Sequence, residues 1–474
     1  MISSEEIAVV DANAAALGVP RKQLMESSGN AVARVVREVA DADDSVALVC
    51  GRGNNGGDAF VAARFLSAFD VTAHLLGRGA TISTDIAREN WAALEAADID
   101  AREVRDSASL ALEDPDVVVD AMLGTGATGA LREPEATAAR VINDGDATVV
   151  SVDVPSGVDA DTGEAAGVAV EADRVVTFHD AKPGLAALDA PVTVADIGIP
   201  AAAERVVERG DLLRLSRDPT AHKGDFGEVL VVGGGPYAGA PALAGRATLR
   251  AGADLVSVAC PAAVADTVQG YDEGLIVEAL PGERVAPDHV DALLAAAADA
   301  DAVVVGPGLG DHDDTTAAVR RFLSSFDGTA VVDADALVAV PAVETAARLL
   351  CTPHRGELAA MADGPVDDVE ARVETLADRL GATLLTKGPR DVVSDGETTR
   401  INRTGTAAMT VGGTGDVLAG VAGALACRLD PLEAAAVAAH ATGRAGEAAA
   451  DGRNGGLVAT DLLETLPAAL RPPA

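Results

Sequence analysis

The sequence predicts an α/β protein with two domains, each a three-layer αβα sandwich around a mainly parallel sheet. Short apolar runs rich in valine alternate along the chain with alanine-rich stretches of helical period, which is typical of strands buried on both faces by helices. With 474 residues, of which 49% are hydrophobic, the chain can form more than one core. We therefore expect two domains of similar architecture.

Five strands are predicted in the first half, each a short run dominated by apolar residues. They cover residues 46–50, 71–76, 117–120, 148–153 and 174–178. A helix is expected at residues 59–69, after a loop that contains Gly51, Gly53, Gly56 and Gly57. A strand, a glycine-rich loop and a helix form the unit from which doubly wound sheets are built.

Six further strands are predicted in the second half. They cover residues 228–232, 254–259, 302–306, 330–333, 348–352 and 383–387. The boundary is placed after residue 210, because residues 205–221 are charged, contain a proline and precede a new strand and glycine loop. The predicted domains are residues 1–210 and 211–474.

The composition excludes some classes of partner. The formal net charge is −38, so no basic surface is available to neutralise phosphates, and nucleic acid is not expected as a partner. A solvated acidic surface of the kind found in salt-adapted cytoplasms is preferred over acid-rich disorder, because half of the residues are apolar. No apolar run approaches the roughly 20 residues of a bilayer span, and the start resembles no signal peptide, so we expect a soluble, cytoplasmic protein without a membrane partner.

Two rare residue types are informative. The four cysteines are far apart and form no CxxC pair, so buried, reduced residues are expected. Of only four lysines, Lys182, Lys223 and Lys387 stand beside or near glycine, which suggests that they contact anions.

Polar residues follow three of the first five predicted strands. The segment NNGGD at residues 54–58 follows the first strand. Asp120 ends the third, before a second glycine-rich turn, and Asp153 ends the fourth, shortly before Ser156. Ligands of open α/β sheets bind at the carboxyl ends of the strands, so a site is favoured over isolated turn formers. Asn55, Asp120 and Ser156 carry hard oxygen donors, which suit an alkali or alkaline-earth cation better than zinc.

The first half resembles the NAD(P)H-hydrate epimerase domain. The resemblance rests on NNGGD, on the segment from Asp120 to Gly126, on VDVPSG at residues 152–157 and on TFHDAKPG at residues 177–184. It implies a Rossmann-like fold, with Asp153 near the reacting nicotinamide ring as acid or base and potassium held by Asn55, Asp120 and Ser156. It also implies that the hydrated cofactor is bound by Asn54, Asn55, Gly56, Gly57, Asp58, Gly124, Thr125, Gly126, Ala127, Thr128, Gly129 and Ala130.

The strongest motif of the second half is VGGTGDVLAG, which begins at residue 411. Its glycine turn leads into an alanine-rich helix, whose first backbone N–H groups, at Gly413, Thr414 and Gly415, would bind a phosphate. Asp416 would then take the proton of a hydroxyl that attacks a phosphoryl group. A plain N-cap aspartate is the alternative, but it leaves the glycines unexplained.

Three further residues of the second half are candidates. Glu357 follows a strand end and could organise magnesium through water. His354 could contact the substrate, although a lone histidine is more often structural. Lys387 ends a predicted strand and could contact nucleotide phosphates.

The second half resembles ribokinase-like small-molecule kinases and, more closely, the ADP- or ATP-dependent NAD(P)H-hydrate dehydratase. HKGDFG, GPGLG, VVDADAL, TPHRGE, TKG, GGTGDVLAG and GLVATDLL occur in the order of that family. The resemblance assigns Ala253, Gly308, His354 and Asp416 to the hydrate. It assigns to the nucleotide Lys387, Gly388, Pro389, Arg390, Asp391 and Gly415. The sequence departs from the family at Asp254, where glycine is usual, at Thr406, where asparagine is usual, and in YDEGLIV.

Together the two resemblances imply repair of hydrated NAD(P)H. The first domain would interconvert (R)- and (S)-NADHX and NADPHX, and the second would dehydrate the (S)-epimers with ADP or ATP. We also expect a homo-oligomer. The alternatives are a vitamin-precursor or sugar kinase with an accessory domain, and a non-enzymatic first domain that senses nucleotides or binds proteins.

Overall fold

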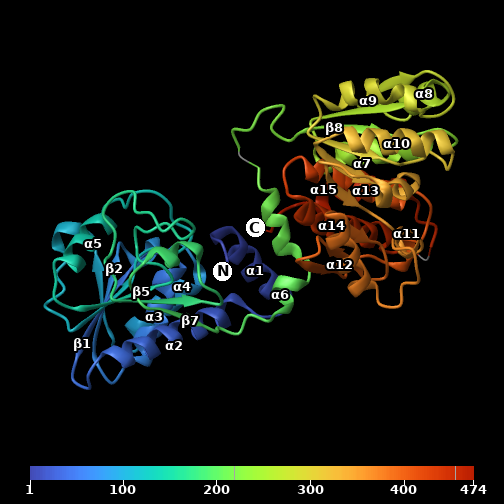
Figure 1. Cartoon of the computed structure of the whole chain (residues 1–474). Helices are drawn as coiled ribbons and strands as arrows, with labels where there is room; N and C mark the ends of the chain where they lie inside the picture. The colour runs from blue at the N-terminus through green and yellow to red at the C-terminus, as the bar shows by residue number, and fades with distance from the viewer. Residues whose placement is uncertain (218, 454, 474) are drawn as a thin grey trace. The chain divides into compact units, whose positions relative to one another are not determined.

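The computed structural model describes residues 1–217, 219–453 and 455–473 and divides them into two compact units, Met1–Ala203 and Glu204–Ala474 (Figure 1). The division falls at residue 203, whereas the sequence placed it at residue 210. The segment after residue 203 belongs to the second unit because Leu212 and Leu215 pack in that unit's core, and Arg400 donates to the buried Asp211 over 2.7 Å.

The first unit contains a seven-stranded sheet in the order β3-β2-β1-β4-β5-β6-β7, with parallel pairing throughout. Its strands are β1 (Ser45–Cys50), β2 (Asp70–Leu76), β3 (Asp100–Val104), β4 (Val117–Ala121), β5 (Thr148–Val152), β6 (Arg174–Phe178) and β7 (Val192–Ala195). The five predicted strands are β1, β2, β4, β5 and β6. The two edge strands, β3 and β7, were not predicted, because their mostly exposed or half-buried residues lack the apolar run of a central strand.

Helices cover both faces of this sheet. The helices are α1 (Ser4–Ala16), α2 (Arg21–Val39), α3 (Asn54–Phe65), α4 (Asp85–Ala96) and α5 (Glu135–Asn143), and a short α6 (Ala202–Arg205) spans the division between units. Val46 and Leu48 of β1 pack on one face with α1 to α4, whereas Ala47 and Val49 pack on the other face with α5. The valine-rich strands are therefore buried on both sides, as the sequence predicted.

Helix α3 begins at Asn54 and ends at Phe65, so the predicted helix at residues 59–69 was wrong at both ends. Gly56 and Gly57 lie in its first turn, and not in a loop. A Cβ atom on Gly56 would lie 2.1 Å from the Gly51 carbonyl oxygen, and one on Gly57 would lie 2.7 Å from Met25. Gly56 thus lets the start of the helix approach the end of β1, and Gly57 leaves room for Met25 of α2.

The second unit contains a nine-stranded sheet in the order β10-β9-β8-β11-β12-β13-β14-β15-β16. Its strands are β8 (Glu228–Val232), β9 (Leu255–Pro261), β10 (Leu275–Leu280), β11 (Ala302–Val305), β12 (Thr329–Val332), β13 (Arg348–Cys351), β14 (Thr383–Thr386), β15 (Asp391–Ser394) and β16 (Thr399–Asn402). The six predicted strands are present, but β10 and the antiparallel pair β15 and β16 were not predicted. The sheet is therefore mixed.

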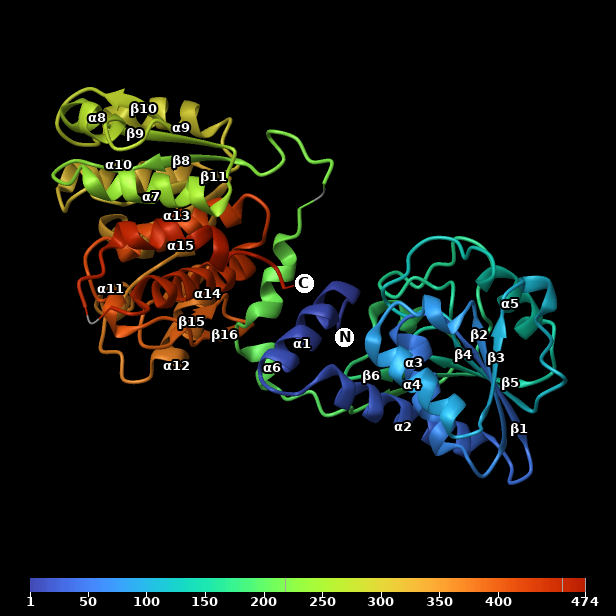
Figure 2. The same ribbon diagram turned by 180° about the vertical axis from the view of Figure 1, so that it is seen from behind.

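Two helical layers enclose this sheet. Helices α7 (Gly239–Ala251), α13 (Thr414–Ala426), α14 (Pro431–Ala450) and α15 (Ala459–Ala469) pack on one face, where Figure 2 shows them side by side. The opposite face carries α9 (Val290–Ala297), α10 (Asp313–Ser325), α11 (Arg355–Met361), α12 (Val369–Leu380) and a 3-10 segment at Ala334–Ala342. The remaining helix of this unit, α8 (Ala262–Gln269), packs beside β10. Each unit is thus a three-layer αβα sandwich.

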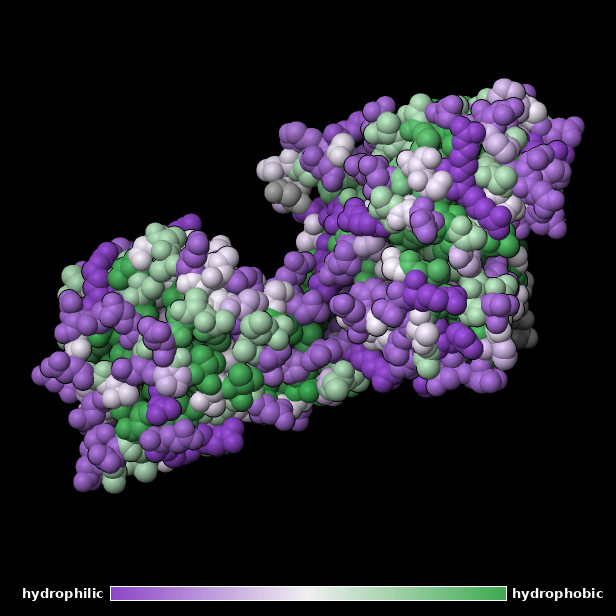
Figure 3. All heavy atoms as spheres, viewed as in Figure 1, coloured by the Kyte–Doolittle hydropathy of each residue, from purple (hydrophilic) through white to green (hydrophobic). Residues whose placement is uncertain are grey.

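Other expectations from composition can be compared with the structure. All four cysteines are free, and Cys50, Cys260 and Cys351 are buried. Hydrophilic residues cover much of the face visible in Figure 3. Within the described ranges, no helix is long and apolar enough to cross a membrane.

Candidate active sites

The first candidate site lies where the strand order of the first unit reverses, between β1 and β4. Loops that follow neighbouring strands diverge there, which opens a crevice at the carboxyl edge of the sheet. A Cβ atom on Gly124 would lie 3.3 Å from Asp153 Oδ2 and 3.4 Å from Asn55 Cγ. The structure therefore brings together the predicted residues that follow β1, β4 and β5.

Asn55, Asp120 and Ser156 belong to one hydrogen-bonded network. Ser156 donates to Asp120 through its backbone N–H over 2.8 Å and through its hydroxyl over 2.6 Å, and Ser151 Oγ donates over 2.9 Å. Asn55 Nδ2 donates to the Leu123 carbonyl over 2.9 Å, and Leu123 N–H donates to Ser156 Oγ over 3.0 Å. Burial raises the pKa of Asp120, while the hydrogen bonds from Ser156 and Ser151 oppose that rise.

The chemistry of this network fits a monovalent cation. Its donors are an amide, a hydroxyl, a backbone carbonyl and a single carboxylate, all of them hard oxygen ligands. Across the described parts of the chain, no group of three or more histidine, cysteine, aspartate or glutamate side chains is placed to hold a metal ion. The first unit thus brings together Asn55, Asp120 and Ser156, the residues predicted to hold a cation.

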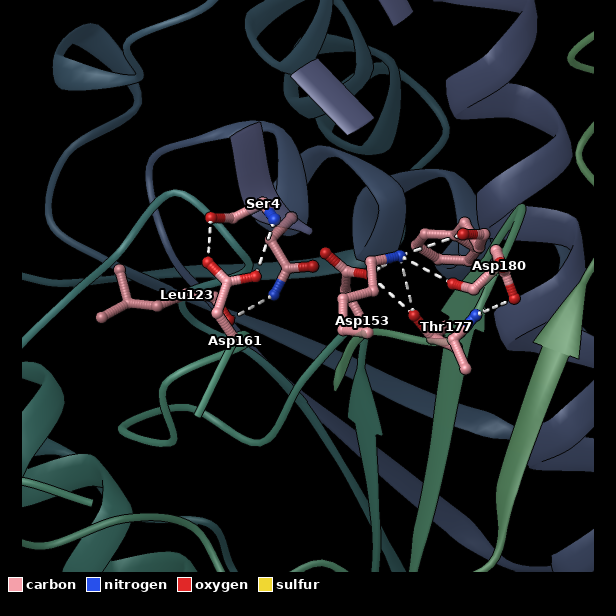
Figure 4. Close-up of polar contacts among 10 residues, drawn as sticks. Ser4, Leu123, Asp153, Asp161, Thr177 and Asp180 are labelled. Carbon is pink, nitrogen blue, oxygen red and sulfur yellow. Dashed lines mark hydrogen bonds and ion pairs between the residues drawn. The ribbon is translucent and has the colours of Figure 1, made fainter. Parts of the chain in front are cut away.

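Asp153 forms a buried ion pair with Lys182. Lys182 Nζ lies 2.9 Å from Asp153 Oδ1, and Thr177 Oγ1 donates to the same oxygen over 3.0 Å (Figure 4). Asp153 adopts a left-handed backbone conformation, with φ of 68°, and donates its N–H to the Val176 carbonyl over 2.7 Å. This conformation is uncommon outside glycine, and it turns the carboxylate toward Gly124.

Two more carboxyl groups lie near Asp153. Burial raises the pKa of Asp58 well above its ordinary value, and the charges of Asp153 and Asp11 raise it further. Burial also raises the pKa of Asp11, although Arg21 and Lys182 oppose the rise. The first site therefore combines one carboxylate with a cationic partner, Asp153, and a second, Asp58, whose neutral form is favoured.

A cavity of about 720 Å³ extends from this site. Of the predicted substrate residues, it is lined by Gly124 and by Gly126 to Ala130, but not by Thr125, Asp153 or residues 54–58. Arg52 and Arg132 also line it, and neither guanidinium forms an ion pair with a described residue. Four acidic residues, Glu133, Glu135, Asp159 and Glu164, line the cavity as well, so the two arginines are its points of contact for a phosphate-bearing ligand.

The second candidate site lies at the start of α13. The preceding turn is half-buried from Gly413 to Asp416 and exposed at Gly412, so it is not sealed in the core. Gly413 has φ of 96°, and the first N–H groups of the helix have no intrahelical acceptor. Burial raises the pKa of Asp416 to about 7, the charge of Asp333 raises it as well, and Lys387 opposes the rise. A carboxylate with this pKa can exchange protons near neutral pH.

Lys387 reaches the same place from the end of β14. Its Nζ donates to Asp333 Oδ1 over 2.8 Å and would lie 3.3 Å from a Cβ atom on Gly415. Thr352 Oγ1 also donates to Asp333 Oδ1, over 2.7 Å. Burial acts to lower the pKa of Lys387, but the neighbouring carboxylates, Asp333 first, outweigh it and raise that pKa. The predicted residues Lys387, Gly415 and Asp416 are thus adjacent.

His354 and Glu357 cap the start of α11. His354 Nδ1 accepts the N–H groups of Gly356 and Glu357 over 3.0 Å each, and Glu357 Oε2 accepts the His354 N–H over 2.8 Å. This reciprocal arrangement is a capping box. The backbone of this segment lies beside Lys387, whose N–H donates to the Pro353 carbonyl, and the charge of Glu357 raises the pKa of Lys387.

The predicted nucleotide loop, residues 387–391, connects β14 to β15. Asp391 Oδ1 accepts the Gly388 N–H and Asp391 Oδ2 accepts Asn402 Nδ2, each over 2.9 Å. Burial raises the pKa of Asp391, and these hydrogen bonds oppose the rise. Asp391 therefore holds the loop closed, while Pro389 and Arg390 are exposed.

The structure separates Ala253 from the other residues predicted to contact the hydrate. Gly308, His354 and Asp416 follow β11, β13 or the glycine turn at the carboxyl edge of the sheet, whereas Ala253 precedes β9 at the amino edge. The helix α7, 13 residues long, connects these two edges. Within one copy of the chain, Ala253 is therefore not positioned to contact a ligand at Asp416.

The departures from the family pattern have local structural roles. Asp254 Oδ2 accepts the N–H groups of Gly224 and Phe226, over 2.7 and 3.0 Å, and so holds the HKGDFG segment. Thr406 Oγ1 accepts the Ala408 N–H over 3.4 Å at the start of a 3-10 turn.

Four residues of these sites were not predicted. Asp333 directly follows β12, and Asp120 is the last residue but one of β4, so the position of Asp333 beside a strand end was an available signal. Arg52 stands within the glycine-rich segment, and a cation there was a further signal. Asp11 and Arg132 carried no comparable signal, since only the fold brings them to the site.

The two units define a class of enzyme: a Rossmann-like domain with an acid–base site, joined to an αβα domain with a kinase-like site at a glycine turn. Residues 229–468 match the family described as NAD(P)H-hydrate dehydratase, and residues 21–184 match the family described as YjeF-related protein N-terminus. A ribokinase-like superfamily protein from Enterococcus faecalis has a similar fold, with a TM-score of 0.51 and 21% identity over 56% of this chain and 95% of that protein.

Relatives also match over nearly the whole chain. The bifunctional NAD(P)H-hydrate repair enzyme Nnr of Pyrobaculum aerophilum is 43% identical over 99% of this chain and 98% of its own length. The enzyme of the same name from Methanothermobacter thermautotrophicus is 42% identical over 98% of this chain and 95% of its length. The chain belongs to the family of bifunctional NAD(P)H-hydrate repair enzymes. This membership favours repair over the small-molecule kinase alternative.

Proposed function

We propose that the first unit interconverts the (R)- and (S)-epimers of NADHX and NADPHX, and that the second unit dehydrates the (S)-epimers with ADP or ATP. The observation that carries this proposal is the position of Asp416, which opens α13 beside a glycine turn and the Lys387–Asp333 pair. A turn whose N–H groups can bind a phosphate, a cation, and a proton acceptor with a pKa of about 7 are thus close together.

In the second unit, Asp416 takes the proton of the ring hydroxyl as its oxygen attacks the terminal phosphoryl group of the nucleotide. The N–H groups at Gly413, Thr414 and Gly415 bind the transferring phosphate. Phosphate then leaves with the oxygen, the lone pair of the ring nitrogen assists its departure, and loss of a ring proton restores the dihydronicotinamide. Gly308 and His354 are proposed to contact the hydrate.

The nucleotide is proposed to lie against residues 387–391 and Gly415. Lys387 supplies a cation to its phosphates. Glu357 Oε2 accepts the His354 N–H and Oε1 lies 3.5 Å from His354 Nε2. This carboxylate is proposed to hold a magnesium ion through water.

In the first unit, Asp153 is proposed to exchange the proton of the ring hydroxyl. Residues 54–58 and 124–130 are proposed to bind the hydrated cofactor, with its phosphates in the cavity lined by Arg52 and Arg132. Asn55, Asp120 and Ser156 are proposed to hold potassium, which would supply a fixed positive charge beside the ligand.

We also propose, from the composition, that the protein works in a cytoplasm of high salt concentration. A net charge of −38 suits a cytoplasm of high ionic strength, where salt screens repulsion between carboxylates. A homo-oligomer is proposed as well. If the dehydratase domain accepts only one epimer, an epimerase domain on the same chain can convert the other epimer into it.

The test gives the purified chain a mixture of both hydrate epimers with magnesium, potassium and either nucleotide. We expect full recovery of reduced-nicotinamide absorbance from the native chain and partial recovery from Asp153→Asn. A stable phosphorylated product, without recovered absorbance, would identify a simple kinase. Unchanged epimer exchange in Asp153→Asn would support the non-enzymatic interpretation of the first unit's site.

A further inference from the structure

Lys182 is the most completely buried charged side chain of the first site, at 1% exposed. Its Nζ lies within hydrogen-bond distance of four oxygens: Asp153 Oδ1, Thr177 Oγ1 and the Phe178 carbonyl at 2.9 Å, and the Asp180 carbonyl at 3.3 Å. An ammonium has only three N–H groups. Lys182 therefore has no donor left for a ligand, and its effect on the site must pass through Asp153.

The two oxygens of Asp153 have different surroundings. Oδ1 receives both Lys182 Nζ and Thr177 Oγ1. Oδ2 lies on the side of Gly124, next to Asn55, where predicted substrate residues meet. Because Oδ1 is held by two donors, the carboxylate cannot rotate freely, and Oδ2 is the oxygen directed to a ligand.

The carboxyl groups near Lys182 differ in their contact with it. Burial favours the neutral forms of Asp58 and Asp11, whereas Asp153 Oδ1 lies 2.9 Å from Lys182 Nζ. A buried ammonium costs several kcal/mol of desolvation, which an apolar side chain of the same volume would avoid. Packing alone therefore does not account for Lys182, whereas its contact with Asp153 Oδ1 does.

We propose that Lys182 is a positioning residue of the epimerisation, one that holds Oδ1 of Asp153 and so directs its Oδ2 to the substrate without touching the substrate itself. This inference rests on the proposed epimerase function of the first unit. Oδ2 takes the proton of the C6 hydroxyl, the C6–N1 bond opens with its electron pair moving to N1, and C6 becomes an aldehyde. After rotation, N1 re-attacks the other face of C6 and the proton returns from Asp153, so no co-reactant is needed.

The test measures epimer exchange by the full chain, without nucleotide, from about pH 5 to pH 9. Lys182→Met removes the cation, Lys182→Arg keeps it, and Thr177→Val removes one donor to Oδ1. Lys22→Met is the matched control, because Lys22 is an exposed lysine of the same unit, paired with Glu89. The single tryptophan, Trp91, is buried against Phe60, so its fluorescence reports the folding of the first unit alone.

We expect Lys182→Met to lower kcat/KM for exchange on the order of a hundredfold. The acid limb of its pH profile should move to higher pH by about one unit, because a carboxylate without its cation is protonated more easily. Lys182→Arg should restore part of the rate and of the limb, and Lys22→Met should match the native chain.

An equal loss at every pH, with unchanged Trp91 fluorescence, would show a structural role only and overturn the proposal. Should Lys182→Met unfold the first unit, Thr177→Val decides: a shifted acid limb supports the proposal and an unshifted one overturns it. A native chain that exchanges no epimers would refute the epimerase function itself. Normal exchange in Lys182→Met beside an inactive Asp153→Asn would refute the positioning role alone.

Discussion

Each unit places a lysine–aspartate ion pair at its site, but the more exposed member of the pair is the aspartate in the first unit and the lysine in the second. In the first unit, Lys182 is 1% exposed and Asp153 is 14% exposed. In the second unit, Asp333 is 2% exposed and Lys387 is 23% exposed. The first pair thus presents a carboxylate to its site, and the second presents an ammonium.

This difference fits the chemistry proposed for each site. A proton exchange at a ring hydroxyl needs a base, so the cation is the buried support and the carboxylate faces the ligand. Phosphoryl transfer needs positive charge at the phosphates, so the carboxylate is the buried support. Each site also has a second carboxyl group with a raised pKa, Asp58 in the first unit and Asp416 in the second.

The largest effect is expected from Asp416→Asn. Nucleotide-dependent dehydration should fall on the order of 10² to 10⁴-fold, because the proton acceptor is lost, while epimer exchange should be unchanged. In the native chain, kcat/KM for dehydration should fall as the pH drops below about 7, where Asp416 becomes protonated. Absorbance assays across pH check both results, and a native profile without this limb would contradict the role of Asp416.

Lys387→Met should have a smaller effect on activity and a second effect on stability. Loss of the cation should raise the KM for nucleotide roughly tenfold, and Asp333, left buried without its partner, should lower the free energy of unfolding of the second unit by about 3 kcal/mol. The double variant Lys387→Met with Asp333→Asn should recover the stability but not the KM. Urea unfolding and nucleotide titration separate these effects, and Arg321→Met, at an exposed arginine of the same unit that pairs with Asp291, is the control.

The smallest effect is expected from Asp58→Asn. Burial favours the neutral form of Asp58, so a neutral isostere should change exchange only a few-fold, far less than Asp153→Asn does. A carboxyl whose folded-state pKa is raised loses its stabilising contribution as the pH rises through that pKa. Asp58→Asn should therefore raise the Tm of the first unit more at pH 8 than at pH 4, as measured by Trp91 fluorescence. A loss as large as that of Asp153→Asn would remove the contrast between the two carboxyl groups.

Much of the fold could be predicted from valine-rich runs and glycine turns. A strand buried on both faces must be apolar along its length, so β1, β4, β8 and β11 are visible in the sequence. Edge strands such as β3, β7 and β16 are not, because one side of each has no neighbouring strand and their residues need not be apolar. The start of α3 was missed because its glycines indicate a loop when packing against β1 is unknown.

The sequence by itself determined which polar residues stand at strand ends and glycine turns, among them Asp120, Asp153, Lys387 and Asp416. Only the tertiary structure decided that Lys182 is buried behind Asp153, that Asp333 is buried behind Lys387, and that Ala253 lies at the other edge of its sheet. The residue types at a turn follow from the local backbone conformation and hydrogen bonding, and they can be read in the sequence. Which member of a pair faces the ligand depends on burial by segments far apart in the chain, and that burial exists only after the sheet and its helices have assembled.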